Sequence, residues 1–419
     1  MIEIANVPRI DSKRLLPVIA GVYTSQSVFS AVIFMALPSI LRDSDTDLDS
    51  IGLLYLLMLP WALKVFWSPM VERYRLNVHA QSRSRKMILI GQALLVFCLF
   101  VSIYIDPSES FMVLVYFLAI ATVIAATVDI VCDGFAIEQL KSTHRSWGNV
   151  MQVGGGYVGM MMGAGLFLVI LDSYSWKIAM MFIVIMVVLL TMPAMLIQEP
   201  KRISTKKNLD ALLRPALLNA LKRPQILWSI LIVILFQFGL RIILSTLPPF
   251  LVDQAFSLTL IGLVSGLMGT VVSLVGVILA GMLINAFGVK NVLTKLIVAQ
   301  LLIYVCFFLV SLSSNISETL LIVLLVSNSL VIGASFVALY TAMMNWSSLS
   351  QAGVDFSLFQ SIDATLLVLL GFVSNLVSHH FGYTATFASA TFVVFVAGIF
   401  IPKLLSRTGD SRTANASSI

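Results

Sequence analysis

Charged residues are scarce in this sequence of 419 residues. Asp, Glu, Lys and Arg make up 11% of the chain, whereas 59% of it is hydrophobic. A soluble globular domain carries about 25% charged residues, so the composition excludes a soluble enzyme or binding domain. Hydrophobic runs of around 20 residues recur along the whole chain, and each is long enough to span about 30 Å of hydrocarbon. We therefore predict an all-α integral membrane protein with no soluble domain.

Cysteine is also rare, and the three that occur do not form a pattern. Cys98, Cys132 and Cys306 lie in different apolar runs, far apart in the sequence, which matches neither a metal site nor a disulfide framework. The glycine-rich stretch from Gly154 to Gly165 lies inside an apolar run and has no Lys-Ser/Thr, so it does not match a nucleotide-binding loop. Its small-xxx-small spacing instead lets helices approach closely in lipid. We expect no metal and no cofactor.

Twelve hydrophobic runs are candidates for membrane-spanning helices. They cover residues 15–41, 50–71, 87–105, 111–137, 148–171, 178–197, 225–251, 259–285, 296–312, 319–346, 357–379 and 383–402. The longest polar connection divides them into six and six. We therefore predict four regions: an N-terminal six-helix bundle (1–197), a cytoplasmic central linker (198–224), a C-terminal six-helix bundle (225–405) and a disordered cytoplasmic tail (406–419).

The basic residues lie almost wholly on one side of these spans. Of the 26 Lys and Arg, 22 fall in alternate connections and at the chain ends; Arg42 and Lys177 fall on the opposite side, and Lys64 and Arg241 inside spans. By the positive-inside rule, this asymmetry predicts that both termini are cytoplasmic. Topology therefore explains the net charge of +6, and we expect no nucleic-acid partner.

The fourth span carries two carboxylates inside the membrane. Asp129 and Asp133 are four residues apart, so they lie on one face of a helix. Intramembrane carboxylates are costly and indicate a functional site. They would form a proton relay or bind a cationic substrate group; alternatively they are structural, neutralised by Lys64, which we place at the same depth. Glu138, at the end of this span, is expected to be solvated.

Other polar residues within the spans offer further candidates. Arg241 is predicted to lie mid-membrane, where it would bind an anionic substrate group or be paired internally. Tyr23 and Gln26 form part of a polar patch that would face a cavity. His379 and His380 are interpreted as residues of the membrane interface.

Four blocks of sequence carry a family resemblance. They are Leu59-Pro60-Trp61, Leu63-Lys64, Trp67-Ser68-Pro69 and Glu72-Arg73-Tyr74 in the second span; Asp129-Ile130, Asp133-Gly134 and Ala136 in the fourth; Gly148-Asn149 and Gln152 in the fifth; and Gln351 to Phe356 with Gln360-Ser361 before the eleventh. With these blocks the chain resembles a group of major facilitators that includes the muropeptide permease AmpG, the acetyl-CoA transporters and the siderophore importers of the RhtX/FptX type. The last block looks most like the siderophore importers.

This resemblance implies a twelve-helix major facilitator fold of two pseudo-symmetric six-helix bundles in the bacterial inner membrane. It further implies a monomer, surrounded by membrane lipid, that is not an enzyme and imports a siderophore or ferric siderophore with protons by alternating access. A muropeptide, an acyl-CoA or a drug-like solute, imported or exported, remains an alternative. An integral-membrane lipid enzyme is a further alternative, although Asp133-Gly134 is followed by Ile137 where the phosphatidyltransferase motif has Arg.

The resemblance also suggests roles for the candidate residues. In this architecture the second and eleventh helices meet, so that a contact between Lys64 and Asp363 would latch the cytoplasmic gate; alternatively Asp363 faces the cytoplasmic vestibule. The expected proton-coupling residues are Asp129 and Asp133; the expected substrate-binding residues are Arg241, Tyr23, Gln26 and Gln152; and the expected ion-pair or gating residues are Lys64, Asp363, Glu72 and Arg73.

Overall fold

The computed structural model describes residues 9–43, 54–76, 83–107, 110–200, 216–254, 256–313 and 317–408. Within these ranges all regular secondary structure is helical. The chain divides into two compact units. Unit 1 comprises Met1–Ala220 and Ser347–Ser361, and unit 2 comprises Leu221–Trp346 and Ile362–Ile419. The first residues of the eleventh span thus cluster with unit 1, whereas most of the predicted linker lies outside the described residues.

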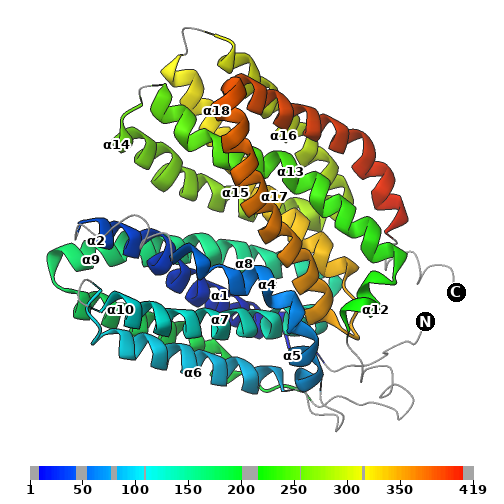
Figure 1. Cartoon of the computed structure of the whole chain (residues 1–419). Coiled ribbons are helices and arrows are strands. Elements are labelled where there is room, and N and C mark those ends of the chain that lie inside the picture. Colours follow the sequence, from blue (N-terminus) through cyan, green and yellow to red (C-terminus); the bar gives the residue numbers. More distant parts are fainter. Residues whose placement is uncertain are drawn as a thin grey trace, which may run out of the picture. The chain divides into compact units, whose positions relative to one another are not determined.

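The helices from α1 to α10 belong to unit 1 (Figure 1). Its elements are α1 (Ser12–Ala31), the π-helical turn η1 (Val32–Ala36) and α2 (Leu37–Asp43); α4 (Leu59–Leu63), the 3₁₀ turn η2 (Lys64–Phe66) and α5 (Ser68–Arg75); α6 (Ser84–Ser102); α7 (Phe111–Gln139); η3 (Ser142–His144), α8 (Arg145–Met160), the π-helical turn η4 (Met161–Leu166) and α9 (Phe167–Ser173); and α10 (Trp176–Leu196).

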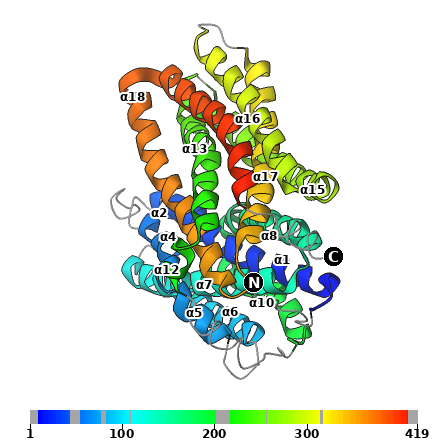
Figure 2. The same cartoon turned by 90° about the vertical axis from the view of Figure 1, so that its right-hand side faces the viewer.

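The remaining elements begin with the short helix α12 (Leu217–Leu221), which ends where unit 2 starts. They continue with α13 (Pro224–Asp253); α14 (Leu258–Ile261), the π-helical turn η5 (Gly262–Met268) and α15 (Gly269–Phe287); α16 (Val289–Ser311); α17 (Glu318–Trp346); and α18 (Ala352–Arg407). Figure 2 shows the chain folding back on itself within α18.

The number of spans agrees with the sequence-based prediction. Ten helices in the described ranges are long and apolar enough to cross a membrane, and the bent pair Leu54–Phe66 and Ser68–Arg75 provides an eleventh. The 56-residue α18 consists of two helices that meet at Gly382. The φ of Gly382 is 81°, a left-handed conformation that glycine adopts without steric cost. Counted as two spans, α18 brings the total to the predicted twelve.

The second span is broken rather than continuous. Its two halves meet at an angle of 60°, and Pro60 and Pro69 lie in the first turns of α4 and α5. Proline has no N–H to donate and clashes with the preceding turn of a helix, so each proline favours a new helical start. Lys64 begins the 3₁₀ turn that ends the first half of the span, just before the break at Trp67.

Close backbone contacts hold pairs of helices together in each unit. In unit 1, a Cβ atom added at Gly163 of the turn η4 would lie 2.2 Å from the carbonyl oxygen of Val28 of α1. In unit 2, a Cβ atom added at Gly276 of α15 would lie 2.1 Å from the carbonyl oxygen of Leu330 of α17. Small residues allow such an approach in lipid, as the glycine spacing of the fifth span predicts.

Polar side chains inside the units pair with one another across helices. Gln92 of α6 donates to the hydroxyl of Ser25 of α1 at 2.8 Å, and Gln300 of α16 donates to the hydroxyl of Ser335 of α17 at 3.0 Å. Large apolar side chains such as Phe372 and Phe392 are exposed, as expected for surfaces that face lipid.

Candidate functional site

The intramembrane carboxylates of unit 1 lie around one lysine. We call Tyr23, Lys64, Asp129 and Asp133 the carboxylate–lysine cluster. Lys64 donates to Oδ2 of Asp129, and its Nζ lies 3.7 Å from Oδ2 of Asp133. The hydroxyl of Tyr23 donates to Oδ1 of Asp133. The ion pair between Lys64 and the fourth span, one of the alternatives derived from the sequence, is therefore present.

Three separate helical segments place these side chains. Asp129 and Asp133 occupy one face of α7, Lys64 comes from the turn η2, and Tyr23 comes from α1. Lys64 is 1% exposed, Asp129 4% and Asp133 0%. Two carboxyl groups thus share one ammonium group away from water, where an unpaired charge is expensive. Oδ2 of Asp133 has no hydrogen-bond partner among the described residues.

The segment before the eleventh span contributes a further contact to this cluster. Lys64 also donates to Oε1 of Gln360, which lies near the start of α18 in the part assigned to unit 1. Gln26, one turn from Tyr23 on α1, donates to the carbonyl oxygen of Ala125 at 3.4 Å. Gln152 of α8 is buried, and its Oε1 has no hydrogen-bond partner in the described ranges.

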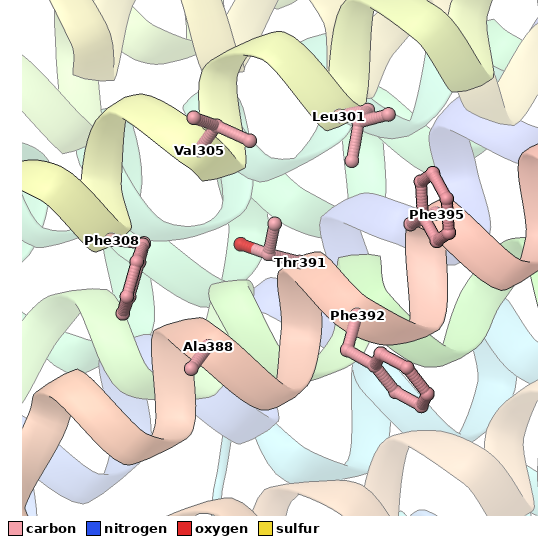
Figure 3. A pocket seen from close by; sticks show the side chains of 7 residues that line it. All are labelled: Leu301, Val305, Phe308, Ala388, Thr391, Phe392 and Phe395. Atoms are coloured by element: carbon pink, nitrogen blue, oxygen red, sulfur yellow. The ribbon is translucent and has the colours of Figure 1, made fainter.

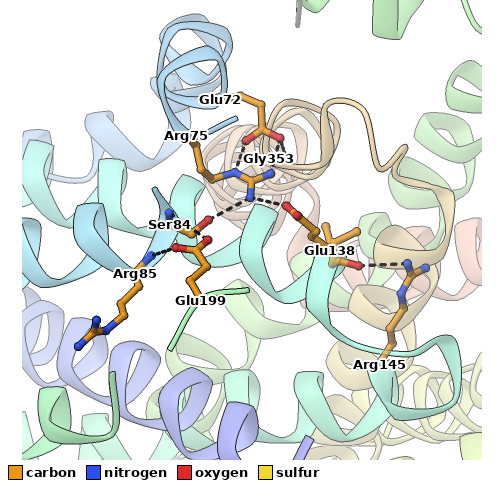
Figure 4. A network of polar contacts seen from close by, with 9 residues as sticks. Glu72, Arg75, Ser84, Arg85, Glu138, Arg145, Glu199 and Gly353 are labelled. Carbon is orange, nitrogen blue, oxygen red and sulfur yellow. Dashed lines mark hydrogen bonds and ion pairs between the residues drawn. The ribbon is translucent and has the colours of Figure 1, made fainter. Parts of the chain in front are cut away.

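Unit 1 contains a second buried charge network (Figure 4). It is centred on Glu72, Arg75 and Glu138, and we call this part of unit 1 the basic end. Arg75 pairs with both oxygens of Glu72, at 2.8 Å each, and with Glu138 at 2.8 Å. It also donates to the hydroxyl of Ser84 at 3.2 Å. The backbone N–H of Gly353 donates to Oε1 of Glu72 at 3.2 Å. The network therefore ties α5, α6 and α7 to the first turn of α18.

This network corrects one sequence-based expectation, at Glu138, and gives Glu72 a partner that was not among the expected gating residues; the gating role of Arg73 stays a prediction. Glu138 is 3% exposed, so the expectation of a solvated helix end is wrong: α7 ends inside the bundle, against Arg75. The cation that pairs with Glu72 is Arg75, whereas Arg73 is exposed. The i,i+3 spacing of Glu72 and Arg75 on one helix face was the signal available in the sequence.

Backbone contacts extend the basic end towards α10. The backbone N–H groups of Ser84 and Arg85 donate to Glu199 at 3.3 and 3.0 Å, and Arg85 donates to the carbonyl oxygen of Met195 at 2.7 Å. Arg145 donates to the carbonyl oxygen of Ile137 at 3.3 Å (Figure 4). These contacts satisfy backbone groups left open at helix ends.

Unit 2 has a charge pair of its own. Nε and Nη2 of Arg241 donate to Oδ1 of Asp363 at 3.1 and 2.7 Å. Gln237 donates to the same oxygen at 2.8 Å, and the hydroxyl of Tyr340 lies 3.4 Å from Oδ2. Asp363 lies about three turns into α18, which begins at Ala352. At about 1.5 Å per residue it lies about 16 Å along the helix.

The structure thus provides Lys64 and Asp363 with partners inside their own units. Lys64 pairs with Asp129, and Asp363 pairs with Arg241. The latch between Lys64 and Asp363 stays a prediction. His379 and His380 are exposed, and the described part of the chain contains no group of His, Cys, Asp and Glu that could hold a metal ion.

An apolar groove of about 320 Å³ lies between α16 and the second half of α18 (Figure 3). Its lining residues are Leu301, Val305, Phe308, Ala388, Thr391, Phe392 and Phe395. The hydroxyl of Thr391 donates to the carbonyl oxygen of Phe387 at 2.8 Å, so it offers little to a polar solute. The groove suits an apolar chain better than the charged substrates considered for the two ion-pair clusters.

Sequence comparisons identify the protein family of the chain. A model of the Major Facilitator Superfamily matches residues 19–327. The chain is 25% identical over 306 residues to "Putative transporter AmpG 4" of Rickettsia felis, with 71% of this chain and 74% of the relative covered. It is 23% identical over 365 residues to the "Anhydromuropeptide permease" of Escherichia coli (strain K12), with 86% and 72% covered.

Solved structures show the same fold. A bacterial homologue of the iron transporter ferroportin matches with a TM-score of 0.68 at 14% identity, over 94% of this chain and 99% of that one. The transporter FucP matches with a TM-score of 0.66 at 15% identity, over 94% and 99%. The chain is thus an integral multi-pass transporter with the predicted twelve spans in two six-helix bundles. Because the family model spans more than half of the sequence, the chain belongs to the Major Facilitator Superfamily.

Proposed function

We propose that this protein imports a siderophore or ferric siderophore across the bacterial inner membrane together with protons, with both termini in the cytoplasm. The observation that carries the coupling is the carboxylate–lysine cluster. It buries two carboxyl groups against one ammonium group. With all three groups ionised, the cluster has a net charge of −1. Binding one proton makes it neutral, which lowers the cost of keeping it away from water.

The geometry supports different roles for the carboxyl groups of Asp129 and Asp133. Asp129 is the direct partner of Lys64, whereas Oδ2 of Asp133 lies 3.7 Å from Nζ and accepts no hydrogen bond from the described residues. Asp133 therefore has an oxygen available for the proton. Nζ of Lys64 lies near both carboxyl groups. A shift of the ammonium group from Asp129 towards Asp133 would stabilise the ionised form of Asp133 and so favour release of its proton, because the titrations of neighbouring groups are coupled. Alternating access would expose the cluster to each side in turn.

The siderophore assignment rests on the block before the eleventh span. In this block Gln360 accepts from Lys64, and the N–H of Gly353 donates to Glu72. The segment that most resembles the siderophore importers therefore contacts both buried charge networks of unit 1. This supports a role for the block in the transport cycle rather than in a loop without function.

Muropeptide import is the second candidate. It is favoured by the relatives named putative AmpG transporter and anhydromuropeptide permease, which align over more than two thirds of this chain. The proton-coupling role of the carboxylate–lysine cluster is the same under either substrate.

The test is uptake into cells that lack their own importers and express the wild type, Asp133→Asn or an empty vector. The compounds are a panel of siderophores labelled in iron or in the chelator, and labelled anhydromuropeptide. We expect siderophore accumulation that needs the protein and is abolished by a protonophore and by Asp133→Asn. Accumulation of the muropeptide alone would replace the siderophore by the second candidate. Accumulation that persists with a protonophore would refute proton coupling.

A further inference from the structure

Arg241 uses only part of its hydrogen-bonding capacity. Its Nε and Nη2 both donate to one oxygen of Asp363, and Nη1 donates to no residue in the described ranges. A guanidinium group has five N–H donors in a planar fork, so the edge formed by Nη1 and Nη2 is open. The residue is only 8% exposed. Donors left open at such depth favour a bound acceptor.

Asp363 is held in place without help from Arg241. Gln237 of α13 donates to its Oδ1 at 2.8 Å, and Tyr340 of α17 contributes its hydroxyl at 3.4 Å from Oδ2. Because two other helices fix this carboxylate, it can hold the guanidinium on the Nε side while the opposite edge binds another group. Asp363 is therefore suited to be a positioning residue for Arg241.

The surroundings of the guanidinium restrict what could bind there. The ring of Phe336 lies 5.2 Å from Cζ of Arg241 and makes an edge contact with Tyr340 at 6.0 Å. Gln237 is fully buried, and its Oε1 has no hydrogen-bond partner among the described residues. The site thus combines a cationic fork, an aromatic wall and an unused acceptor.

We propose that the Nη1–Nη2 edge of Arg241 binds a carboxylate group of the transported molecule, with its apolar or planar body against Phe336. A planar carboxylate matches the guanidinium fork with two parallel hydrogen bonds. A hydroxyl or amide N–H next to the carboxylate would satisfy Oε1 of Gln237. This inference rests on the proposed transport function, and it specifies the substrate class as hydroxy or N-acyl carboxylates.

The negative charge of Asp363 should weaken the binding of a carboxylate to Arg241, and this effect can be measured. The pair of Arg241 and Asp363 is neutral, so a bound carboxylate adds an unbalanced negative charge. Asp363→Asn removes the competing charge, keeps the shape of the side chain, and leaves an amide oxygen that can still accept from Arg241 and Gln237. We therefore expect this variant to bind carboxylates about tenfold more tightly than the wild type. A purely structural ion pair would not produce this gain.

The test is calorimetric binding to the purified full-length protein. The probes are citrate with its trimethyl ester, salicylate with salicylamide, and N-acetylmuramate with its methyl ester. At least one acid should bind the wild type about tenfold more tightly than its uncharged partner. Arg241→Gln/Asp363→Asn, which leaves no unpaired charge, should bind acid and partner alike. Lys295→Gln changes an exposed cation of the same unit and should behave as the wild type does.

Each outcome decides the proposal. Equal binding of acids and uncharged partners by the wild type, or no binding of any acid at millimolar concentration, would overturn it. So would a preference for acids that survives in the double variant, or an Asp363→Asn variant with unchanged affinity. Because binding is measured without a proton gradient, failure of siderophore import would leave this result standing, and failure here would leave the import assay unaffected.

Discussion

The hydroxyl of Tyr23 donates to Oδ1 of Asp133, 110 residues further along the chain. This bond leaves only Oδ2 of Asp133 available to a proton or to Lys64. The proposed proton carrier is therefore restrained on one side by α1 and open on the other. The functional importance of that restraint can be measured.

We expect Tyr23→Phe to reduce proton-coupled uptake about tenfold, because loss of one hydrogen bond to a charged group is worth about 1.5 kcal/mol or more. The measurement is the initial uptake rate at saturating and limiting substrate. Tyr304→Phe is the matched control: Tyr304 is fully buried in unit 2, and its hydroxyl has no partner in the described structure. Equal losses in the two variants would argue against a role for the Tyr23 bond.

Asp133→Asn should separate accumulation from exchange. Without a carboxyl group to carry the proton, we expect accumulation against a gradient to fall more than about 100-fold, because binding of substrate no longer depends on the proton. Exchange of labelled for unlabelled substrate across vesicles should continue. Accumulation at the wild-type level in this variant would assign the proton to another residue.

Lys64→Met should be poorly folded, because it leaves Asp129 and Asp133 buried without a cation. Removing one partner of a buried ion pair costs about 3–5 kcal/mol. The double variant Lys64→Met/Asp129→Asn removes one charge of each sign, and we expect it to recover most of the thermal stability but not the transport. The measurements are the unfolding temperature in detergent and uptake. A double variant no more stable than the single one would contradict the pairing.

Arg75→Met should lower the stability of unit 1 for the same reason. Arg75 pairs with both Glu72 and Glu138 at the basic end, so its loss should cost about 3–5 kcal/mol. Arg73→Met is the matched control, since Arg73 is exposed and an exposed substitution is usually within about 0.5 kcal/mol. Thermal unfolding of the two purified variants tests the difference.

Gly163→Ala should loosen the contact between α1 and the turn η4, which continues α8. The added Cβ would lie 2.2 Å from the carbonyl oxygen of Val28, which is backbone and cannot turn aside. Overpacking of this kind costs about 1–3 kcal/mol. Gly165→Ala is the control, because nothing lies within 4 Å of a Cβ there. If both variants lower the unfolding temperature equally, helix geometry rather than the contact is responsible.

The spans and the pairing of Lys64 were predictable because both depend on position along the membrane normal. Hydrophobic length sets each span, and Lys64 and the two aspartates fall at similar depths in helices that run the same way. The roles of the residues remain predictions. The contact of Lys64 with Gln360 could not be predicted from the sequence, because it depends on which part of α18 clusters with unit 1.

The basic end shows most clearly what the sequence does not reveal. Arg75 looks like one of several basic residues in a loop, and Glu138 like the end of a helix. The structure extends α5 to Arg75 and buries it against α7, because the 60° break at Trp67 redirects the second half of the span. A hydropathy pattern contains no information about that angle, so it could not predict this network.

The packing of α1 on α8 has a consequence for the order of assembly. Thr24 of α1 is buried, and a Cβ atom added at Gly155 of α8 would lie 2.8 Å from its hydroxyl oxygen. Among the described elements, α8 is the most extensive neighbour of α1. The ribosome makes α1 before α8, so this hydroxyl group enters the bilayer several helices before the glycine that covers it. Until then, lipid or the insertion machinery has to accommodate the hydroxyl group, and we expect the insertion of α1 to depend on that assistance.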